Sequence, residues 1–269
     1  MSAWDGSPRS VTQPPDAWAA FRQLTPARIG LGRAGVSLPT RAHLDFQLAH
    51  ARARDAVHLA LDAAALATEL ARALAHTGID IATVRSAARD RTEYLQRPDL
   101  GRRLDDASRA RLSTCAAGEA APPDVAFVVA DGLSAAAASR HAAPVLERLV
   151  PRLAVSEWRI APVAVAEQGR VALGDEIGEL LGAPLALVLL GERPGLSSPD
   201  SLGAYLTWAP TPGRRDAERN CVSNIRPEGL GYAAAADRLL FFLTEARRRR
   251  LTGIALKDEW ALPGAAAGG

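Results

Sequence analysis

Apolar residues in the first half of the chain recur mostly at helical spacing. Residues 40–76 carry one stripe of leucine and alanine at steps of three and four, which predicts a single long helix over this segment. A second helical pattern covers about 80–95, and a third covers about 105–112. We therefore expect a mostly helical N-terminal region, with a loop at 24–40, where prolines and glycines gather.

The pattern changes after residue 121. Runs made only of apolar residues appear at 125–130 and 185–190, and such runs are typical of strands that are buried on both faces of a sheet. Two more strands are expected at 158–164 and 204–209, with helices between and after the strands. This alternation predicts the α/β class. The expected fold is a helical N-terminal region followed by a Rossmann-like, doubly wound parallel-sheet domain.

These patterns divide the chain into three parts. Residues 1–15 contain prolines, serines and no apolar run, so we expect a disordered leader and not a secretory signal. Residues 16–121 are the helical region, and residues 122–269 are the sheet domain. The prolines at 122 and 123 mark the boundary between the two.

Composition narrows the range of functions only a little. The 269 residues are 48% hydrophobic and 23% charged, which indicates a folded globular protein. A net charge of +2 gives no reason to expect a nucleic-acid partner. Only two cysteines, Cys115 and Cys221, argue for a reducing, cytoplasmic compartment. No apolar run approaches the roughly 20 residues that span a membrane, so no membrane-spanning segment is expected.

Polar loops that contain glycine follow three of the predicted strands. They cover 131–134, 167–174 and 191–198. Because the carboxyl ends of parallel strands meet at one edge of a sheet, these loops predict a crevice for a large ligand. A fourth polar tract, 216–230, contains Cys221 and is expected to be a loop at the same edge. In this crevice Asp131 is either a pocket residue or the cap of the helix that follows it.

Other motifs carry less weight. The Gly-x-Gly-x-x-Gly at 30–35 lacks the strand and helix that a dinucleotide site requires, so contact with a partner is the better interpretation. None of the five histidines is spaced with cysteine or glutamate as a metal ligand. No base can be assigned to Cys221 as a nucleophile, so no catalytic apparatus is visible. The charged run at 85–103 is either a solvated face or a docking surface.

Several long motifs resemble the small (light) subunit of ethanolamine ammonia-lyase. They are Leu-Thr-Pro-Ala-Arg-Ile at 24–29 with the glycine loop at 30–40, the segment 44–58, Tyr-Leu-Gln-Arg-Pro-Asp-Leu-Gly-Arg at 94–102, Asp-Gly-Leu-Ser at 131–134, Glu-Arg-Pro-Gly-Leu at 192–196, the tract around Cys221, and Leu-Lys-Asp at 256–258. The resemblance covers nearly the whole chain after the leader. Several motifs are ten residues or longer, which makes chance similarity a poor explanation.

The resemblance implies a subunit of an enzyme that converts ethanolamine to acetaldehyde and ammonia with adenosylcobalamin. It implies that the large subunit, a TIM barrel, carries the substrate site and that this chain holds the cobalamin against it. Carried over residue by residue, the cobalamin contacts fall on Val171, Glu192 and Cys221, with no catalytic residue and no metal ligand in this chain. The helical region would dock on the large subunit. The leader is a candidate targeting segment for a bacterial microcompartment.

The residues alone leave a second hypothesis open. A stand-alone α/β module could bind a small molecule, or could be an enzyme that uses Cys221 as a nucleophile. The two hypotheses differ in what the isolated chain does. A lyase subunit is inactive without its partner, whereas a stand-alone enzyme is active alone and loses that activity in Cys221→Ala.

Overall fold

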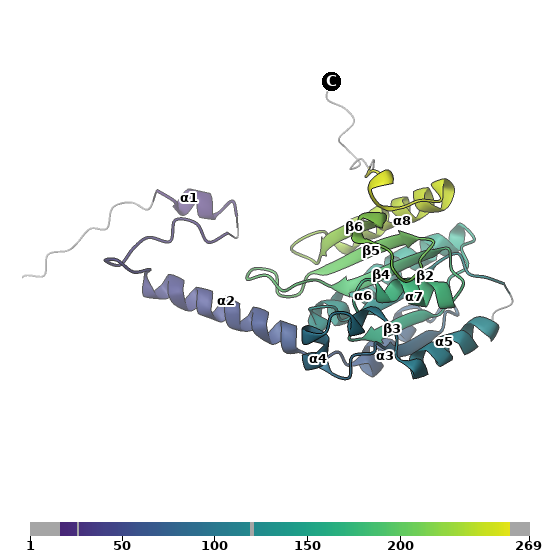
Figure 1. Ribbon diagram of the computed structural model, residues 1–269. Helices are drawn as coiled ribbons and strands as arrows, with labels where there is room; N and C mark the ends of the chain where they lie inside the picture. Colours follow the sequence, from purple (N-terminus) through teal and green to yellow (C-terminus); the bar gives the residue numbers. More distant parts are fainter. Residues whose placement is uncertain (1–16, 26, 119–120, 259–269) are drawn as a thin grey trace, which may run out of the picture. The chain divides into compact units, whose positions relative to one another are not determined.

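The computed structural model describes residues 17–25, 27–118 and 121–258 (Figure 1). The chain divides into two compact units, Met1–His50 and Ala51–Gly269. In the first unit, the short helix α1 (Ala19–Arg22) precedes a glycine-containing loop and the helix α2 (Thr40–His58), which runs on into the second unit. The expected leader, 1–15, lies outside the described residues.

The second unit is an α/β structure built on one six-stranded sheet, which confirms the expected class. Its other α-helices are α3 (Ala63–Ala73), α4 (Arg91–Gln96), α5 (Asp106–Gly118), α6 (Ala135–Val155), α7 (Leu173–Leu180) and α8 (Tyr232–Arg249). Short 3-10 turns are η1 (Leu100–Arg102), η2 (Asp216–Glu218) and η3 (Gly253–Ala255). Its strands are β1 (Ile81–Arg85), β2 (Ala126–Ala130), β3 (Val163–Glu167), β4 (Leu185–Gly191), β5 (Leu202–Trp208) and β6 (Arg219–Ile225). Among the described residues, no helix has both the length and the apolar character to cross a membrane.

The sheet is mixed but mostly parallel, so the expected parallel sheet is confirmed only in part. The strand order is β1-β3-β2-β4-β5-β6. The first four strands in this order pair in parallel, but β5 pairs antiparallel with both β4 and β6. Only residues 192–201 separate β4 from β5. A parallel crossover needs about a dozen residues or more, usually with a helix, so this link forces β5 to turn back.

Four expected elements differ from those in the structure. The strand expected at 158–164 is β3, which begins only at Val163 and runs to Glu167. The long helix at 40–76 is two helices, because the Asp62 carboxylate accepts a hydrogen bond from the amide of Ala65 and starts α3 afresh. The helix at 80–95 is β1 followed by α4. In β1 the burial alternates along Ile81–Arg85, the period of a strand. The tract around Cys221 forms the edge strand β6 and is not a loop.

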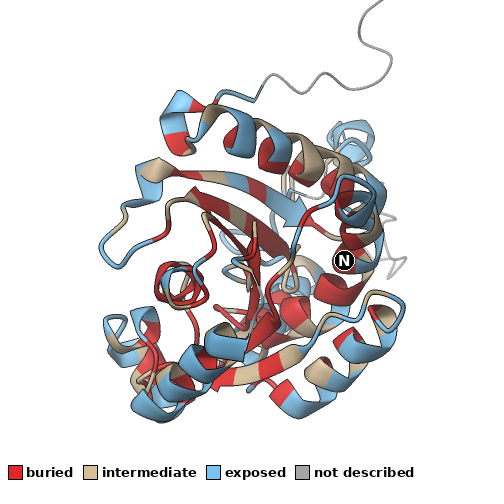
Figure 2. Cartoon of the chain, turned by 90° about the vertical axis from the view of Figure 1, so that its right-hand side faces the viewer, coloured by how far each residue is buried: buried red, intermediate tan, exposed pale blue. Residues whose placement is uncertain are grey.

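Helices cover both faces of the sheet, and the strand residues alternate between them (Figure 2). In β2 and just before it, Val125, Phe127 and Val129 pack into the core beneath α3, α6 and α8. The alternate residues of β2, with Val128 at the centre, pack beneath α5 and α7. All five residues of β2 are buried, which explains its uninterrupted apolar sequence.

The carboxyl ends of the central strands lie together at one edge. The last residue of β2, Ala130, is level with Ala166 in β3 and with Leu190 in β4. The loops that begin at Asp131, Glu167 and Gly191 therefore leave the sheet side by side. The strand order puts three of the predicted polar loops where a ligand crevice was expected.

Candidate functional site

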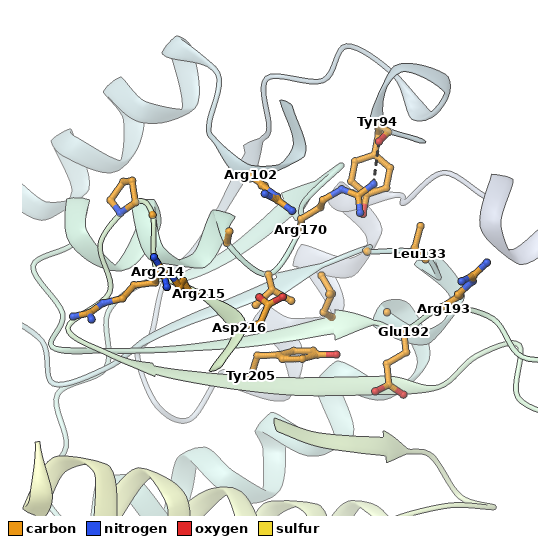
Figure 3. Close-up of a pocket in the computed structure, with 17 residues that line it drawn as sticks. Tyr94, Arg102, Leu133, Arg170, Glu192, Arg193, Tyr205, Arg214, Arg215 and Asp216 are labelled. Carbon is orange, nitrogen blue, oxygen red and sulfur yellow. Dashed lines mark hydrogen bonds between the residues drawn. The ribbon is translucent and has the colours of Figure 1, made fainter. Parts of the chain in front are cut away.

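A cavity of about 900 Å³ opens at this edge of the sheet (Figure 3). Tyr94, Arg102 and Tyr205 line it together with the segments 132–133, 170–172, 190–193 and 212–216. All three predicted loops contribute, and so do the α4–η1 region and the loop that leads into β6. A drug-sized ligand fills a pocket of about 300–1,000 Å³, so the cavity has room for a substantial part of a large cofactor.

Two glycines bring the loops after β2 and β4 into backbone contact. The amide of Leu133 donates to the carbonyl of Gly191 at 2.9 Å. Gly132 has a φ of +51°, and a Cβ on it would lie 2.2 Å from that carbonyl oxygen. A Cβ on Gly191 would in turn lie 2.0 Å from the carbonyl oxygen of Ser134. Only glycine fits at either position, and this contact fixes the floor of the cavity.

Asp131 lies beneath the cavity and is not among the residues that line it. Its carboxylate is fully buried, pairs with Arg91 at 3.1 Å and accepts from the amide of Gly169 at 3.0 Å. Helix α6 is capped by Ser134, whose hydroxyl accepts from the amide of Ala137. Both interpretations of Asp131, as a pocket residue and as the helix cap, are therefore wrong. Asp131 instead ties the loop after β2 to the loop after β3.

Tyr94 and its neighbours extend this buried network to the cavity wall. The Tyr94 ring lies between the guanidinium groups of Arg91, at 4.8 Å, and Arg170, at 4.7 Å. Its hydroxyl donates to the carbonyl of Gly169 at 3.2 Å, and burial raises the pKa of Tyr94 to about 12. Part of the charged run at 85–103 is thus neither a solvated face nor a docking surface, because Arg91 is buried against Asp131.

Glu192 has a fixed environment on the opposite side of the cavity from Tyr94 (Figure 3). Its carboxylate accepts from the hydroxyl of Ser201 at 2.5 Å and from the amide of Asn224 at 3.2 Å. The side chain lies against Gly203, where a Cβ would come within 2.8 Å of Oε1. These contacts hold the carboxylate in place. Val171, from the loop after β3, also lines the cavity.

Cys221 stands beside the cavity and not among its lining residues. It lies on β6 directly opposite Tyr205 of β5, and Tyr205 lines the cavity. Cys221 is an exposed residue, yet the packing around its thiol raises the pKa, and a hydrogen bond with Tyr205 offsets only part of that effect. The structure thus brings Val171 and Glu192 into one cavity and places Cys221 next to its wall.

The cavity walls carry more positive than negative charge. Five arginines line it, at 102, 170, 193, 214 and 215, against the carboxylates of Glu192 and Asp216. Below the wall a buried ion pair joins Arg219 to Asp175 through two contacts of 2.6 Å. No group of three or more histidine, cysteine, aspartate or glutamate side chains in the described part of the chain could hold a metal ion. The excess of arginines suits a ligand that carries negative charge.

Several of these residues were not predicted from the sequence. Tyr94 and Arg102 come from the half that was expected to be helical and separate from the crevice. The one usable signal was their occurrence together in the motif at 94–102. Tyr205 lies on a strand that was expected, and Asp216 begins a tract expected at this edge. The place of Tyr205 in the cavity wall and the loop 212–215 were not predicted, because both depend on the antiparallel pairing of β5.

The comparisons with known proteins agree on one family. The family model described as ethanolamine ammonia-lyase light chain (EutC) matches residues 15–257. The chain belongs to the ethanolamine ammonia-lyase light-chain family. Ethanolamine ammonia-lyase small subunits from Azotobacter vinelandii and Pseudomonas aeruginosa are each 60% identical to it over 242 residues, which is 90% of this chain and 88% and 87% of theirs. The small subunit from Ralstonia nicotianae is 57% identical over 259 residues, 96% of this chain and 94% of its own.

Membership confirms the resemblance seen in the sequence motifs. The chain is the small subunit of an ethanolamine ammonia-lyase, a carbon–nitrogen lyase of ethanolamine degradation. A small subunit implies a large one, so a large-subunit partner follows from the family. The hypothesis of a stand-alone module loses its basis.

Proposed function

We propose that the cavity of this ethanolamine ammonia-lyase small subunit binds part of adenosylcobalamin and holds it against the large subunit. The observation that carries the proposal is the meeting of Val171 and Glu192, from loops after different strands, in one cavity of about 900 Å³. That volume takes only a part of so large a cofactor. The remainder would lie against the large subunit.

The side chains present fit this cofactor. The corrin ring is edged by neutral amides, which both donate and accept hydrogen bonds. Glu192 offers a fixed acceptor, and Gly132 and Gly191 let the backbone come close. The guanidinium of Arg170 lines the cavity, stacked on the Tyr94 ring, and can donate to a ligand. Cys221 would reach the cofactor at the rim, beside Tyr205.

When bound, adenosylcobalamin would supply the radical chemistry of the lyase reaction. The residues of this chain bind the cofactor, orient it and exclude water from it. Glu192 would accept from a corrin amide, and the glycine contact between the loops would keep the surface beneath it fixed. We assign no proton transfer to this chain, because its buried acids are engaged with arginines and amides.

A nucleophilic role for Cys221 has little support. Its thiol has a raised pKa, and a protonated thiol is a weak nucleophile at neutral pH. Its neighbour is the Tyr205 hydroxyl, whose pKa is also raised by burial, so Tyr205 is a poor base. We therefore keep Cys221 as a cofactor contact.

We further propose that the N-terminal region, 16–121, docks on the large subunit. In its first part, large apolar side chains are exposed to solvent, among them Val36, Leu44 and Leu48. Leu44 and Leu48 are one turn apart and so lie on the same face of α2. A cytoplasmic location and a microcompartment address in the leader stay predictions, since residues 1–15 lie outside the described part.

Co-expression with the large subunit tests this function. We expect acetaldehyde release only when both subunits are present, and we expect Cys221→Ala to assemble with the large subunit as the wild type does. Acetaldehyde release by the isolated chain, lost in Cys221→Ala, would contradict the proposal.

A further inference from the structure

Two arginines at one rim of the cavity have no counter-charge in the described residues. Arg102 ends η1, and Arg170 follows β3. Their backbones are in contact, because the amide of Arg170 donates to the carbonyl of Gly101 at 2.8 Å. Figure 3 shows the two side chains next to each other at the cavity. Among the described residues, neither guanidinium forms an ion pair with a carboxylate.

The guanidinium of Arg170 is fixed but not satisfied. It stacks on the Tyr94 ring at 4.7 Å, and Nη2 donates to the carbonyl of Tyr94 at 3.3 Å. Its Nε–H is buried without a hydrogen-bond partner. The other N–H groups of this guanidinium, which lines the cavity, can donate to an anionic oxygen of a ligand.

Two of the other charged groups in the cavity wall already have partners. Glu192 accepts from Ser201 and Asn224, and Arg214 pairs with Glu218. Asp216 lies 3.7 Å from Arg219. Neither Glu192 nor Asp216, the two carboxylates of the described cavity wall, forms an ion pair with Arg102 or Arg170. Two adjacent guanidinium groups of this kind match the oxygens of a phosphate ester.

We propose that Arg102 and Arg170 bind the phosphodiester of the nucleotide loop of adenosylcobalamin. This inference rests on the proposed function and extends it. The phosphodiester is the one anionic side group of the cofactor, whereas the amides around the corrin need no cation. The assignment orients the cofactor in the cavity, with the nucleotide loop beside Arg102 and Arg170 and the corrin edge towards Glu192 and Tyr205.

The test compares two corrinoids in the assembled complex of both subunits. Adenosylcobinamide lacks the phosphodiester and the nucleotide, and adenosylcobalamin has both. Dissociation constants from the corrin absorbance are measured for the wild type, Arg102→Gln and Arg170→Gln, with the exposed neighbour Arg103→Gln as the matched control. We expect Arg102→Gln, at an exposed position that the fold tolerates, to weaken adenosylcobalamin binding by about tenfold or more, the effect of losing a charged hydrogen bond. Its affinity for adenosylcobinamide and both affinities of Arg103→Gln should stay as in the wild type.

Other results overturn the assignment in distinguishable ways. Equal weakening of both corrinoids in Arg102→Gln, with easier dissociation of the subunits at high salt, would mean that the arginines pair with a carboxylate of the large subunit. No weakening of either would remove them from the site. A wild-type complex that binds neither corrinoid would overturn the proposed function together with this inference.

Discussion

At the scale of single residues, Glu192 has the best-defined environment among the residues expected to contact the cofactor. The hydroxyl of Ser201 and the amide of Asn224 both donate to its carboxylate. These two donors hold the side chain in one orientation without help from a ligand. A pre-oriented acceptor loses little conformational entropy when a cofactor amide binds to it.

Replacing Glu192 tests its role directly. We expect Glu192→Ala to weaken adenosylcobalamin binding in the two-subunit complex by about 1–3 kcal/mol, because one buried hydrogen-bond partner is lost. Titration of the corrin absorbance measures the change. The exposed Glu179→Ala, on α7 and away from the cavity lining, is the control and should bind as the wild type does. Unchanged affinity in Glu192→Ala would remove Glu192 from the site.

Asp131 makes the stability of the chain depend on pH. Burial raises the pKa of this carboxyl to about 6, although Arg91 and the amide of Gly169 both act to lower it. The unfolded-state value is about 3.9, so the folded chain binds the extra proton between about pH 4 and pH 6. The resulting stabilisation is fully present below about pH 4 and is lost as the pH rises through 6.

A comparison with Asp131→Asn isolates this effect. We expect the free energy of unfolding of the wild type, minus that of Asp131→Asn, to fall by up to about 3 kcal/mol from pH 4 to pH 7, because only the wild type titrates here. Urea unfolding at the two pH values measures it, with the exposed Asp55→Asn as the control. A difference that is constant, or that grows with pH, would contradict the assignment.

Sequence reasoning could predict some of these residues and not others. The loops that hold Val171 and Glu192 were predictable because the ends of parallel strands meet at one edge. The family resemblance, and not the pattern, singled out these two residues within the loops. Tyr94, Arg102 and Tyr205 were not predictable, because their place in the wall depends on contacts between segments far apart in the chain. For Asp131 the pattern gave the position but not the partner, since Arg91 is 40 residues away.

At the scale of elements, a buried ion pair connects α7 to the antiparallel edge. Arg219, at the start of β6, donates two hydrogen bonds of 2.6 Å to Asp175 near the start of α7. It also donates to the hydroxyl of Thr207 at 2.7 Å and to the carbonyl of Arg214 at 3.0 Å. The segment 212–216 and the end of the loop after β3 both line the cavity, so this pair holds two of its walls together.

Breaking the pair should be costly. We expect Arg219→Met to lower the free energy of unfolding by about 3–5 kcal/mol, since Asp175 is left charged and buried without a partner. The half-exposed pair of Arg152 with Asp237 is the matched control, and Arg152→Met there should cost at most about 1 kcal/mol. Urea unfolding of both variants gives the comparison. Equal, small losses would show that the buried pair does not hold the fold.

The elements themselves were predicted unevenly. The strands β2 and β4 were predicted because both of their faces are buried and their sequences are wholly apolar. The edge strands β1 and β6 were missed, because each has exposed positions and polar residues. Their sequence pattern is therefore typical of a helix or a loop. The reversal of β5 follows from the short link after β4, a constraint that periodicity alone does not register.

At the scale of the whole molecule, the N-terminal region carries apolar side chains that the chain itself leaves exposed. Leu24 is 82% exposed and Leu44 is 60% exposed. Exposed leucines in such number usually mark a surface that a partner covers. The large subunit that the family implies is the partner we assign to it.

Deletion of residues 1–40 tests this assignment. We expect the shortened chain to keep its sheet, because every strand lies in the second unit, and to lose co-purification with the large subunit. Deletion of residues 1–15 alone is the control and should leave assembly intact. Circular dichroism reports the fold, and affinity co-purification reports the assembly. Full recovery of the complex after deletion through Thr40 would contradict docking by this segment.

The central claim is that this chain provides one side of a cobalamin site which the large subunit completes. Titration of adenosylcobalamin into the purified chain, with and without the large subunit, tests it most directly through the corrin absorbance. We expect tight binding and acetaldehyde release only when both subunits are present. Equally tight binding by the chain alone, or no binding in either case, would contradict the claim.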